Sequence, residues 1–513
     1  MPLHFHLTDG AISCSILTKL IDFFMSITAT LQPKIKNFIK GDFVPSPKET
    51  IDVISPLDGS VISTVPMSGY DHLDQAVKAA EVAYPSWSSK TLKERVQVFF
   101  KYRQLLEDNI DELTKLVTLE NGKIYSEAKA EVEKSIELCE FAVSMPQILT
   151  NEVQEVSRGV ECRIERKPLG VVASISPFNF PNMVPHWTIP NAIVLGNCMI
   201  LKPSEVVPLS AVRMAELLKE AGLPDGVFNI VHGGKEIVEA ICDHPDIKAV
   251  SFVGSTKVAK IVYKRASSTL KRCVALGGAK NHLIVLPDAN PEMTANNVVA
   301  SMSGCAGQRC MAAAVMVGVD RVDHIVERMI TEAKKIVPGD TLGSVISKEA
   351  KERIEKYITD AENAGAKILV DGRNATVAGK DGGFYVGATI VDHVTPDMAI
   401  AKEEVFGPVI SIIRAKDLDE ALSIENSSGY GNAAAVFTQN GGLARQVIDR
   451  ASAGMVGVNI GVPVPREPFP FGGWNDSKFG VCDITGKSSI EFWTQNKKTS
   501  VKWNPEARTN WMS

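Results

Sequence analysis

Apolar and polar positions follow two different periods along the first half of the chain. Residues 71–84 and 91–118 carry apolar side chains at helical spacing with charged faces between them, which predicts amphipathic helices. A third such helix is predicted over 210–221. Four short apolar runs are typical of buried parallel strands: 171–175, 198–201, 228–231 and 250–253. Strands that alternate with helices predict a doubly wound α/β layer between about Gly170 and Asp288.

A second α/β region is predicted from about Asn290 onward. The alternation over 492–502 and the segment 152–167 are two further candidate strand regions. At 513 residues, the chain is long enough for two or three domains.

The first 30 residues do not match a targeting signal. The apolar run 17–27 is broken by Lys19 and Asp22, and no Lys or Arg precedes it. We interpret residues 1–30 as an N-terminal extension from an overlong start, with Met25 as the natural beginning. The alternative is a loosely packed terminal segment.

Composition narrows the choice of partners. The net charge is −5 and 22% of residues are charged, which argues against nucleic acid or an anionic membrane as a partner. Nine cysteines without a Cys-x-x-Cys pair fit a reducing, cytoplasmic location, and no zinc-ligand spacing occurs. No apolar run reaches the roughly 18 residues that a membrane span needs.

Cys310 is the candidate nucleophile of the chain. It follows Gly307, Gln308 and Arg309. A neighbouring arginine lowers the pKa of a thiol and raises the fraction of thiolate, which is the form that attacks carbonyl groups. The alternative is ordinary burial, which is common for free cysteine. Cys305, five residues earlier, is expected to be a packing residue.

Cys310 belongs to a series of motifs in a fixed order. The others are 176–182 (SPFNFPN), 201–205 (LKPSE), 252–256 (FVGST), 402–408 (KEEVFGP) and 471–477 (FGGWNDS). In this order the chain resembles the aldehyde dehydrogenase superfamily from about Ile35 to Trp503. Residues 278–282 (GAKNH), 287–290 (PDAN) and 307–312 (GQRCMA) are similar to the CoA-acylating methylmalonate-semialdehyde dehydrogenases.

The resemblance implies an aldehyde-dehydrogenase-like α/β fold in three parts. Residues 31–150 and 168–288 would form a Rossmann-type NAD-binding domain, and 289–484 an α/β catalytic domain. Residues 151–167 and 485–505 would form a small β arm that pairs with a neighbouring subunit. We therefore expect a homo-oligomer, a dimer or a tetramer.

The resemblance also implies the catalytic roles. Cys310 would attack the aldehyde carbon, form a thiohemiacetal and become a thioester after hydride transfer to NAD. Asn179 would donate its amide to the developing oxyanion. The alternative for Asn179 is a turn cap beside Pro181.

The NAD site would draw on four segments. Its implied residues are Ser176, Pro177, Phe178, Lys202, Ser204, Glu205, Gly254, Ser255, Glu404 and Phe406. Gly254 and Ser255 would open a helix whose free N–H groups face the pyrophosphate. Glu205 would accept hydrogen bonds from a ribose 2′-OH and repel a 2′-phosphate, which favours NAD over NADP. An alternative interpretation makes Ser204 the N-cap of a helix.

One expected carboxylate is missing. Hydrolytic members of the superfamily keep a glutamate in the region that corresponds to 270–280, where this chain has no Asp or Glu. Without a general base, attack by water loses a factor of about 10²–10⁴. A thiol needs less help, so we expect coenzyme A to release the acyl group. The alternatives are hydrolysis assisted by another carboxylate, and a catalytically silent binding protein on the same fold.

The substrate is expected to be a small acidic semialdehyde. Arg309 could bind a carboxylate with two parallel hydrogen bonds. The resembled subfamily has an arginine where this chain has Lys134, and usually an apolar residue where it has Arg466. We expect Arg309 and Arg466 to flank the anionic tail, with Lys134 at the pocket mouth. A surface ion pair is the alternative for Arg466. Malonate semialdehyde fits as well as methylmalonate semialdehyde.

Overall fold

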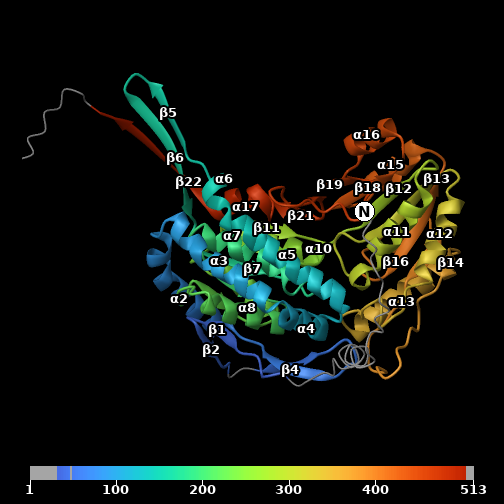
Figure 1. Cartoon of the computed structure of the whole chain (residues 1–513), viewed down its shortest axis with the longest axis horizontal. Coiled ribbons are helices and arrows are strands. Elements are labelled where there is room, and N and C mark those ends of the chain that lie inside the picture. The colour runs from blue at the N-terminus through green and yellow to red at the C-terminus, as the bar shows by residue number, and fades with distance from the viewer. Residues whose placement is uncertain (1–31, 47–48, 504–513) are drawn as a thin grey trace, which may run out of the picture.

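An eight-stranded sheet forms the centre of one lobe in the computed structural model, which describes residues 32–46 and 49–503 (Figure 1). Five parallel strands are flanked by antiparallel edge strands, in the order β2-β1-β9-β8-β7-β10-β11-β21. The strands are β1 (Asn37–Ile39), β2 (Asp42–Val44), β7 (Val171–Ile175), β8 (Cys198–Lys202), β9 (Phe228–Ile230), β10 (Ile247–Val253), β11 (Arg272–Leu276) and β21 (Lys478–Gly480). The four predicted strands are confirmed, and the N-terminal extension with Met25 lies outside the described residues.

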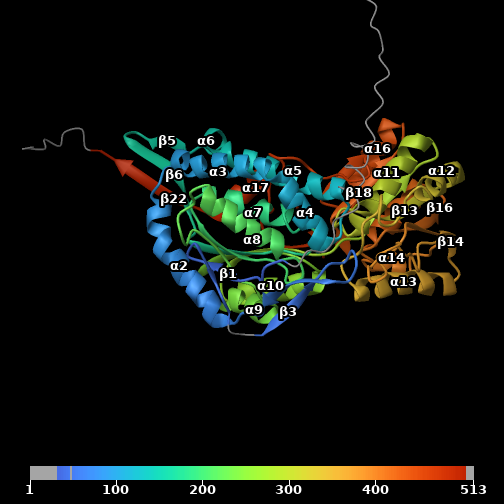
Figure 2. The same cartoon turned by 60° about the horizontal axis from the view of Figure 1, so that its bottom comes forward.

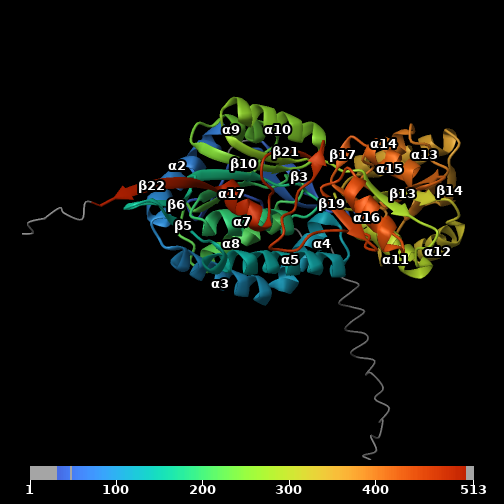
Figure 3. The ribbon, with the colours of Figure 1, turned by 90° about the horizontal axis from the view of Figure 1, so that it is seen from above.

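Helices cover both faces of this sheet. Figure 3 shows α9 (Lys235–Asp243) and α10 (Thr256–Ser268) on one face, and α7 (Met183–Val194) and α8 (Leu209–Glu220) on the other. The outer helices are α2 (Tyr70–Ser88), α3 (Leu92–Asp108), α4 (Ile110–Asn121), α5 (Tyr125–Val143) and the short α6 (Met145–Ile148). A hairpin of β3 (Thr50–Ile54) and β4 (Val61–Pro66) lies beside them.

The predicted helix over 91–118 is in fact two helices. Asn109 separates α3 from α4 with a non-helical backbone (φ −107°, ψ 19°). Its side-chain amide donates to the carbonyl oxygen of Leu105 at 2.8 Å. Such a local side-chain bond competes with the helical ladder, so the chain turns at this residue although the apolar period continues.

A seven-stranded sheet forms the second lobe, in the order β14-β15-β16-β13-β12-β18-β19. Its strands are β12 (Asn281–Val285), β13 (Ala313–Val319), β14 (Lys367–Val370), β15 (Thr389–Asp392), β16 (Val409–Ala415), β18 (Ala433–Phe437) and β19 (Met455–Val458). Its helices are α11 (Pro291–Ser303), the 3₁₀ turn η1 (Gly304–Gly307), α12 (Asp323–Ala333), α13 (Lys348–Asn363), α14 (Ala399–Lys402), α15 (Leu418–Asn426) and α16 (Gly441–Arg450).

The sheet pairing differs from the predicted domain division at two strands. β12 lies before the expected boundary at Asp288 but pairs with β13 and β18 in the second lobe. β21 lies after that boundary and pairs with β11 in the first lobe. A fully buried apolar strand such as β12 fits the centre of either sheet, so its sequence does not reveal its partner.

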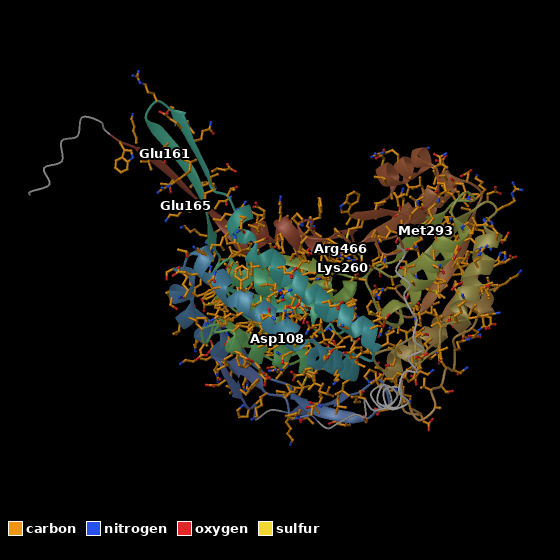
Figure 4. All side chains as sticks on the ribbon, in the orientation of Figure 1. Asp108, Glu161, Glu165, Lys260, Met293 and Arg466 are labelled. Atoms are coloured by element: carbon orange, nitrogen blue, oxygen red, sulfur yellow. The ribbon has the colours of Figure 1, made fainter. Side chains whose placement is uncertain are left out.

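A three-stranded arm projects away from the first lobe (Figures 1 and 2). It consists of β5 (Glu152–Ser157), β6 (Val160–Pro168) and β22 (Thr494–Lys502), which follows α17 (Gly486–Trp493). β22 pairs antiparallel with β6 along its whole length. Figure 4 shows Glu161 and Glu165 on this arm, far from Arg466 and Lys260 at the junction of the two lobes. A two-stranded ladder of β17 (Tyr430–Gly431) and β20 (Trp474–Asn475) completes the described strands.

Candidate functional site

The direction of chain winding reverses between β7 and β10. These two strands are parallel neighbours, and the helices that follow them lie on opposite faces of the sheet. Ligands of open α/β sheets bind at such a switch point, beyond the carboxyl ends of the strands. At this edge of the sheet, β7 is followed by residues 176–182 and β10 is followed by Gly254 and Ser255. The neighbouring strand β8 ends there at Lys202.

A cleft of about 1710 Å³ opens at this edge and is lined by residues of both lobes. The structure brings every residue of the predicted site to its wall. The catalytic and cofactor candidates there are Cys310, Asn179, Ser176, Pro177, Phe178, Lys202, Ser204, Glu205, Gly254, Ser255, Glu404 and Phe406, and the substrate candidates are Arg309, Arg466 and Lys134.

Cys310 lies in the loop between η1 and β13. Its carbonyl oxygen accepts hydrogen bonds from the side-chain amides of Asn281 and Asn432, each at 2.8 Å. Burial, and secondarily the charge of Glu404, raises the pKa of the Cys310 thiol to about 12. Arg309 lowers this pKa, as predicted from the sequence, but the thiol is not acidic. The lowering effect of Arg309 on the pKa is smaller than the effect of burial.

Asn179 is fixed beside this loop. Its side-chain nitrogen donates to the carbonyl oxygen of Gln308 at 2.9 Å, two residues before Cys310. An amide has two N–H bonds, and the bond to Gln308 uses one of them. The turn-cap interpretation of Asn179 has no support in this geometry, because its side chain bonds to a segment 129 residues away.

A buried ion pair holds the loop that carries Asn179, and sequence reasoning missed it. Lys123 and Glu131 are 2% and 0% exposed and form a short salt bridge. Lys123 Nζ also donates to the carbonyl oxygen of Asn179 at 2.5 Å and lies 3.9 Å from the ring centre of Phe180.

The other oxygen of Glu131 completes this support. It accepts the backbone N–H groups of Asn182 at 2.8 Å and Met183 at 3.1 Å. Asn121 donates to the carbonyl oxygen of Phe178 at 2.8 Å. The loop 178–183 is thus held at both ends by α4, α5 and the turn between them.

Features suited to a dinucleotide lie at the other end of the cleft. Lys202 Nζ and Glu205 Oε2 are 2.7 Å apart. Ser255 occupies the N-cap position of α10 but makes no side-chain capping bond, which leaves N–H groups of the first turn for an anion. The alternative role of Ser204 as an N-cap is wrong, because α8 begins at Leu209 with Pro208 in the cap position.

Glu404 reaches across from the second lobe. Its Oε1 accepts the backbone N–H of Ala279 at 2.9 Å, and burial raises its pKa to about 7. A Cβ atom at Gly278 would lie 2.3 Å from Glu404 Oε2, so a side chain at this position would displace the carboxylate. The ring of Phe406 meets that of Phe178 edge to face, with centroids 5.8 Å apart.

The three candidate cations for the substrate differ in their surroundings. The Arg309 side chain is 25% exposed and lies against Glu127 and Cys305. Lys134 binds Glu467 at 2.7 Å and Glu137 at 2.9 Å. Arg466 is 81% exposed and lies 3.6 Å from Glu137, an arrangement that matches its alternative interpretation as a surface ion pair.

Comparison with known proteins agrees with this geometry. The model of the aldehyde dehydrogenase family matches residues 43–499. The chain belongs to the aldehyde dehydrogenase family.

Two curated relatives of this aldehyde dehydrogenase are malonate-semialdehyde dehydrogenase 2 of Bacillus thuringiensis and malonate-semialdehyde dehydrogenase 1 of Geobacillus thermodenitrificans. Each is 45% identical over 91% of this chain, and the alignments cover 98% and 99% of the relatives. A solved methylmalonate-semialdehyde dehydrogenase from Oceanimonas doudoroffii is 40% identical, with a TM-score of 0.91 over 92% of this chain and 99% of that chain. A structure from Sinorhizobium meliloti 1021, a candidate methylmalonate-semialdehyde dehydrogenase complexed with NAD, has the same identity and TM-score over 93% and 99%.

Two classes of feature are absent from the part of the aldehyde dehydrogenase that the structure describes. Within residues 32–46 and 49–503, no helix is long and apolar enough to cross a membrane. No group of three or more His, Cys, Asp or Glu side chains in the same ranges is placed to hold a metal ion.

Proposed function

We propose that this aldehyde dehydrogenase oxidises a small acidic semialdehyde of the malonate or methylmalonate semialdehyde class. NAD would be the oxidant, and coenzyme A would receive the acyl group. Support comes from the names of the relatives that match nearly the whole chain. Cys310, Asn179 and Arg309 line one cleft, which supplies a nucleophile, an amide donor and a cation for the substrate.

The residues at the dinucleotide end of the cleft fit NAD. Glu205 offers a carboxylate to ribose hydroxyls, and the uncapped start of α10 offers N–H groups to the pyrophosphate. Glu404 and Phe406 would hold the nicotinamide end. NAD, when bound, accepts the hydride that leaves the substrate carbon.

Cys310 and Asn179 account for the chemistry on the protein side. The Cys310 thiol loses its proton, for which Glu404 is the candidate acceptor, its sulfur forms a bond to the aldehyde carbon, and the carbonyl electron pair moves to oxygen. The free N–H of Asn179 and the backbone N–H of Cys310 stabilise that oxyanion. Loss of hydride restores the carbonyl and leaves a thioester on Cys310. The coenzyme A thiolate then displaces the Cys310 thiolate.

The segment that follows β11 supports coenzyme A as the acceptor of the acyl group. β11 and the following residues to Lys280 contain no carboxylate, and Gly277 and Gly278 line the same cleft as Cys310. Water therefore has no general base from this segment, whereas a thiol is a strong nucleophile near neutral pH. Glu404 supports the alternative, a hydrolytic enzyme. Its pKa of about 7 suits a general base, and its charge raises the pKa of the Cys310 thiol.

We further propose a cytoplasmic homo-oligomer, a dimer or tetramer. The arm exposes Val153 and Val156, which are 62% and 54% exposed, as a partner subunit would require. The cysteines of the described residues are free thiols, in keeping with a reducing compartment.

The substrate proposal is tested by initial rates of NADH formation with malonate semialdehyde, methylmalonate semialdehyde and propanal at saturating NAD and coenzyme A. We expect kcat/KM for either acidic aldehyde to exceed that for propanal. Equal values for all three would refute an acidic substrate.

A further inference from the structure

We infer that Glu127, Gly304 and Cys305 form a cradle that fixes the orientation of the Arg309 guanidinium and thereby sets the preference for an acidic aldehyde. The inference rests on the proposed function, in which Arg309 binds the substrate carboxylate. None of the three residues touches the reacting atoms, so they are positioning residues.

The cradle holds the guanidinium on three sides. Arg309 Nε donates a hydrogen bond to Cys305 Sγ at 3.2 Å. Arg309 Nη2 lies 3.7 Å from Glu127 Oε1. The group also lies directly over Gly304, where a Cβ atom would come within 2.4 Å of Nη1. All of these residues except Gly304 line the cleft.

The backbone of the cradle is itself held in place. Glu127 Oε1 also accepts the backbone N–H of Cys305 at 2.7 Å. Cys305 and Ala306 both adopt left-handed conformations, with φ values of 53° and 52°. Such conformations are costly for residues with a side chain and persist only where surrounding contacts enforce them. Cys305 is 3% exposed, so its thiol is directed by packing as well.

This arrangement leaves one edge of the guanidinium for a ligand. Nε donates its hydrogen bond to the Cys305 thiol. Nη1 and Nη2 of Arg309 make no hydrogen bond to any of the described residues, and Nη2 has only the 3.7 Å approach to Glu127. Two parallel hydrogen bonds from those nitrogens match the two oxygens of a carboxylate. Glu127 opposes an anion by its charge, so its contribution is orientation of the arginine rather than attraction of the substrate.

Three substitutions test the contributions of Gly304 and Cys305 to the cradle. Gly304→Ala keeps an allowed backbone, since φ is −54° and ψ is 133°, but its methyl group displaces the guanidinium. Cys305→Ala removes the acceptor for Nε, and Cys305→Ser retains one. The readout is the ratio of kcat/KM for malonate semialdehyde to kcat/KM for propanal, with KM and kcat determined separately.

The cradle predicts a graded loss of this ratio. We expect a fall of about tenfold or more for Gly304→Ala and about three- to tenfold for Cys305→Ala, the weaker effect reflecting that a thiol is a weak acceptor even for a charged donor. Cys305→Ser should stay within about twofold of the wild-type ratio. The loss should be seen mainly in KM for malonate semialdehyde, because the carboxylate is bound equally before and during the reaction.

The controls distinguish failure of the cradle from failure of the proposed function. Arg309→Ala must remove the wild-type preference for malonate semialdehyde; if there is no preference or it survives this change, both proposals are overturned. If Arg309→Ala removes the preference but Gly304→Ala and Cys305→Ala leave the ratio unchanged, the cradle alone is overturned. Equal losses for both aldehydes in the cradle variants would also overturn it. If Gly304→Ala fails to fold, the comparison of Cys305→Ala with Cys305→Ser decides the matter.

Discussion

Replacement of Lys123 by methionine should damage both stability and turnover through one buried interaction. The Lys123 side chain is 2% exposed, and its ammonium group bonds to Glu131 and to the carbonyl oxygen of Asn179. Methionine retains the length of the side chain but leaves Glu131 as a charge in a 0% exposed position without its cation. Removal of one partner of a buried pair typically costs about 3–5 kcal/mol of stability.

The loop that carries Asn179 should lose its anchor at the same time. The charge-assisted hydrogen bond to the Asn179 carbonyl contributes about 1.5–3 kcal/mol to holding the loop. A less ordered amide donor stabilises the oxyanion less well, so we expect kcat with malonate semialdehyde to fall by about tenfold or more. Urea unfolding followed by tryptophan fluorescence and steady-state NADH formation measure the two effects.

The double variant Lys123→Met with Glu131→Gln provides the matched control. It leaves no buried charge, and the glutamine can still accept the N–H groups of Asn182 and Met183. It should therefore recover about half of the lost stability while kcat stays low, because the bond to Asn179 is still absent. If Lys123→Met has the wild-type kcat, Lys123 does not position Asn179. If the double variant is less stable than Lys123→Met alone, the buried charge of Glu131 is not the cause of the lost stability.

Three further substitutions test individual side chains. Asn179→Ala should lower kcat by about 10²–10³-fold through the loss of one oxyanion donor, with unchanged labelling of Cys310 by iodoacetamide; a kcat within a factor of three of wild type would exclude that role. Arg309→Ala should raise KM for malonate semialdehyde by about 10- to 150-fold, the equivalent of a hydrogen bond between charged groups, and KM for propanal far less. Burial raises the pKa of Glu404 from 4.5 to about 7. The ionised carboxylate is the stronger acceptor for a ribose hydroxyl, so kcat/KM for NAD should rise as pH increases through about 7. Because the folded chain then holds an extra proton between pH 4.5 and about 7, the contribution of Glu404 to the free energy of unfolding decreases as pH rises over that window. Glu404→Gln should abolish both dependences, and an inflection near pH 7 that persists in this variant belongs to another group.

The local pattern of apolar and polar residues was sufficient to predict much of the secondary structure of the first lobe. The strands at 171–175 and 198–202 are short apolar runs that end at Ser176-Pro177 and Lys202-Pro203. Proline at the end of an apolar run predicts the end of a strand without any knowledge of tertiary contacts. The residues that follow these strands converge on one cleft because parallel strands place their carboxyl ends at the same edge of the sheet.

The parts that the sequence did not reveal depend on contacts between distant segments. The pairing of β12 with β18 is one example, since 147 residues lie between Val285 and Ala433. The thiol pKa of Cys310 is another, because burial outweighs the adjacent arginine. Cys305 was expected to be a packing residue, and only the folded loop turns its sulfur toward Arg309 Nε. The partnership of Lys123 with Glu131 likewise arises from the packing of α5 against the loop 178–183.

The central claim is that coenzyme A, rather than water, releases the acyl group from Cys310. It is tested most directly by NADH formation from malonate semialdehyde with and without coenzyme A, with the product identified by mass spectrometry. Turnover that requires coenzyme A and yields an acyl-CoA thioester is the predicted result. Full turnover without coenzyme A, yielding a free carboxylic acid, would contradict the account and make Glu404 the first candidate for the general base.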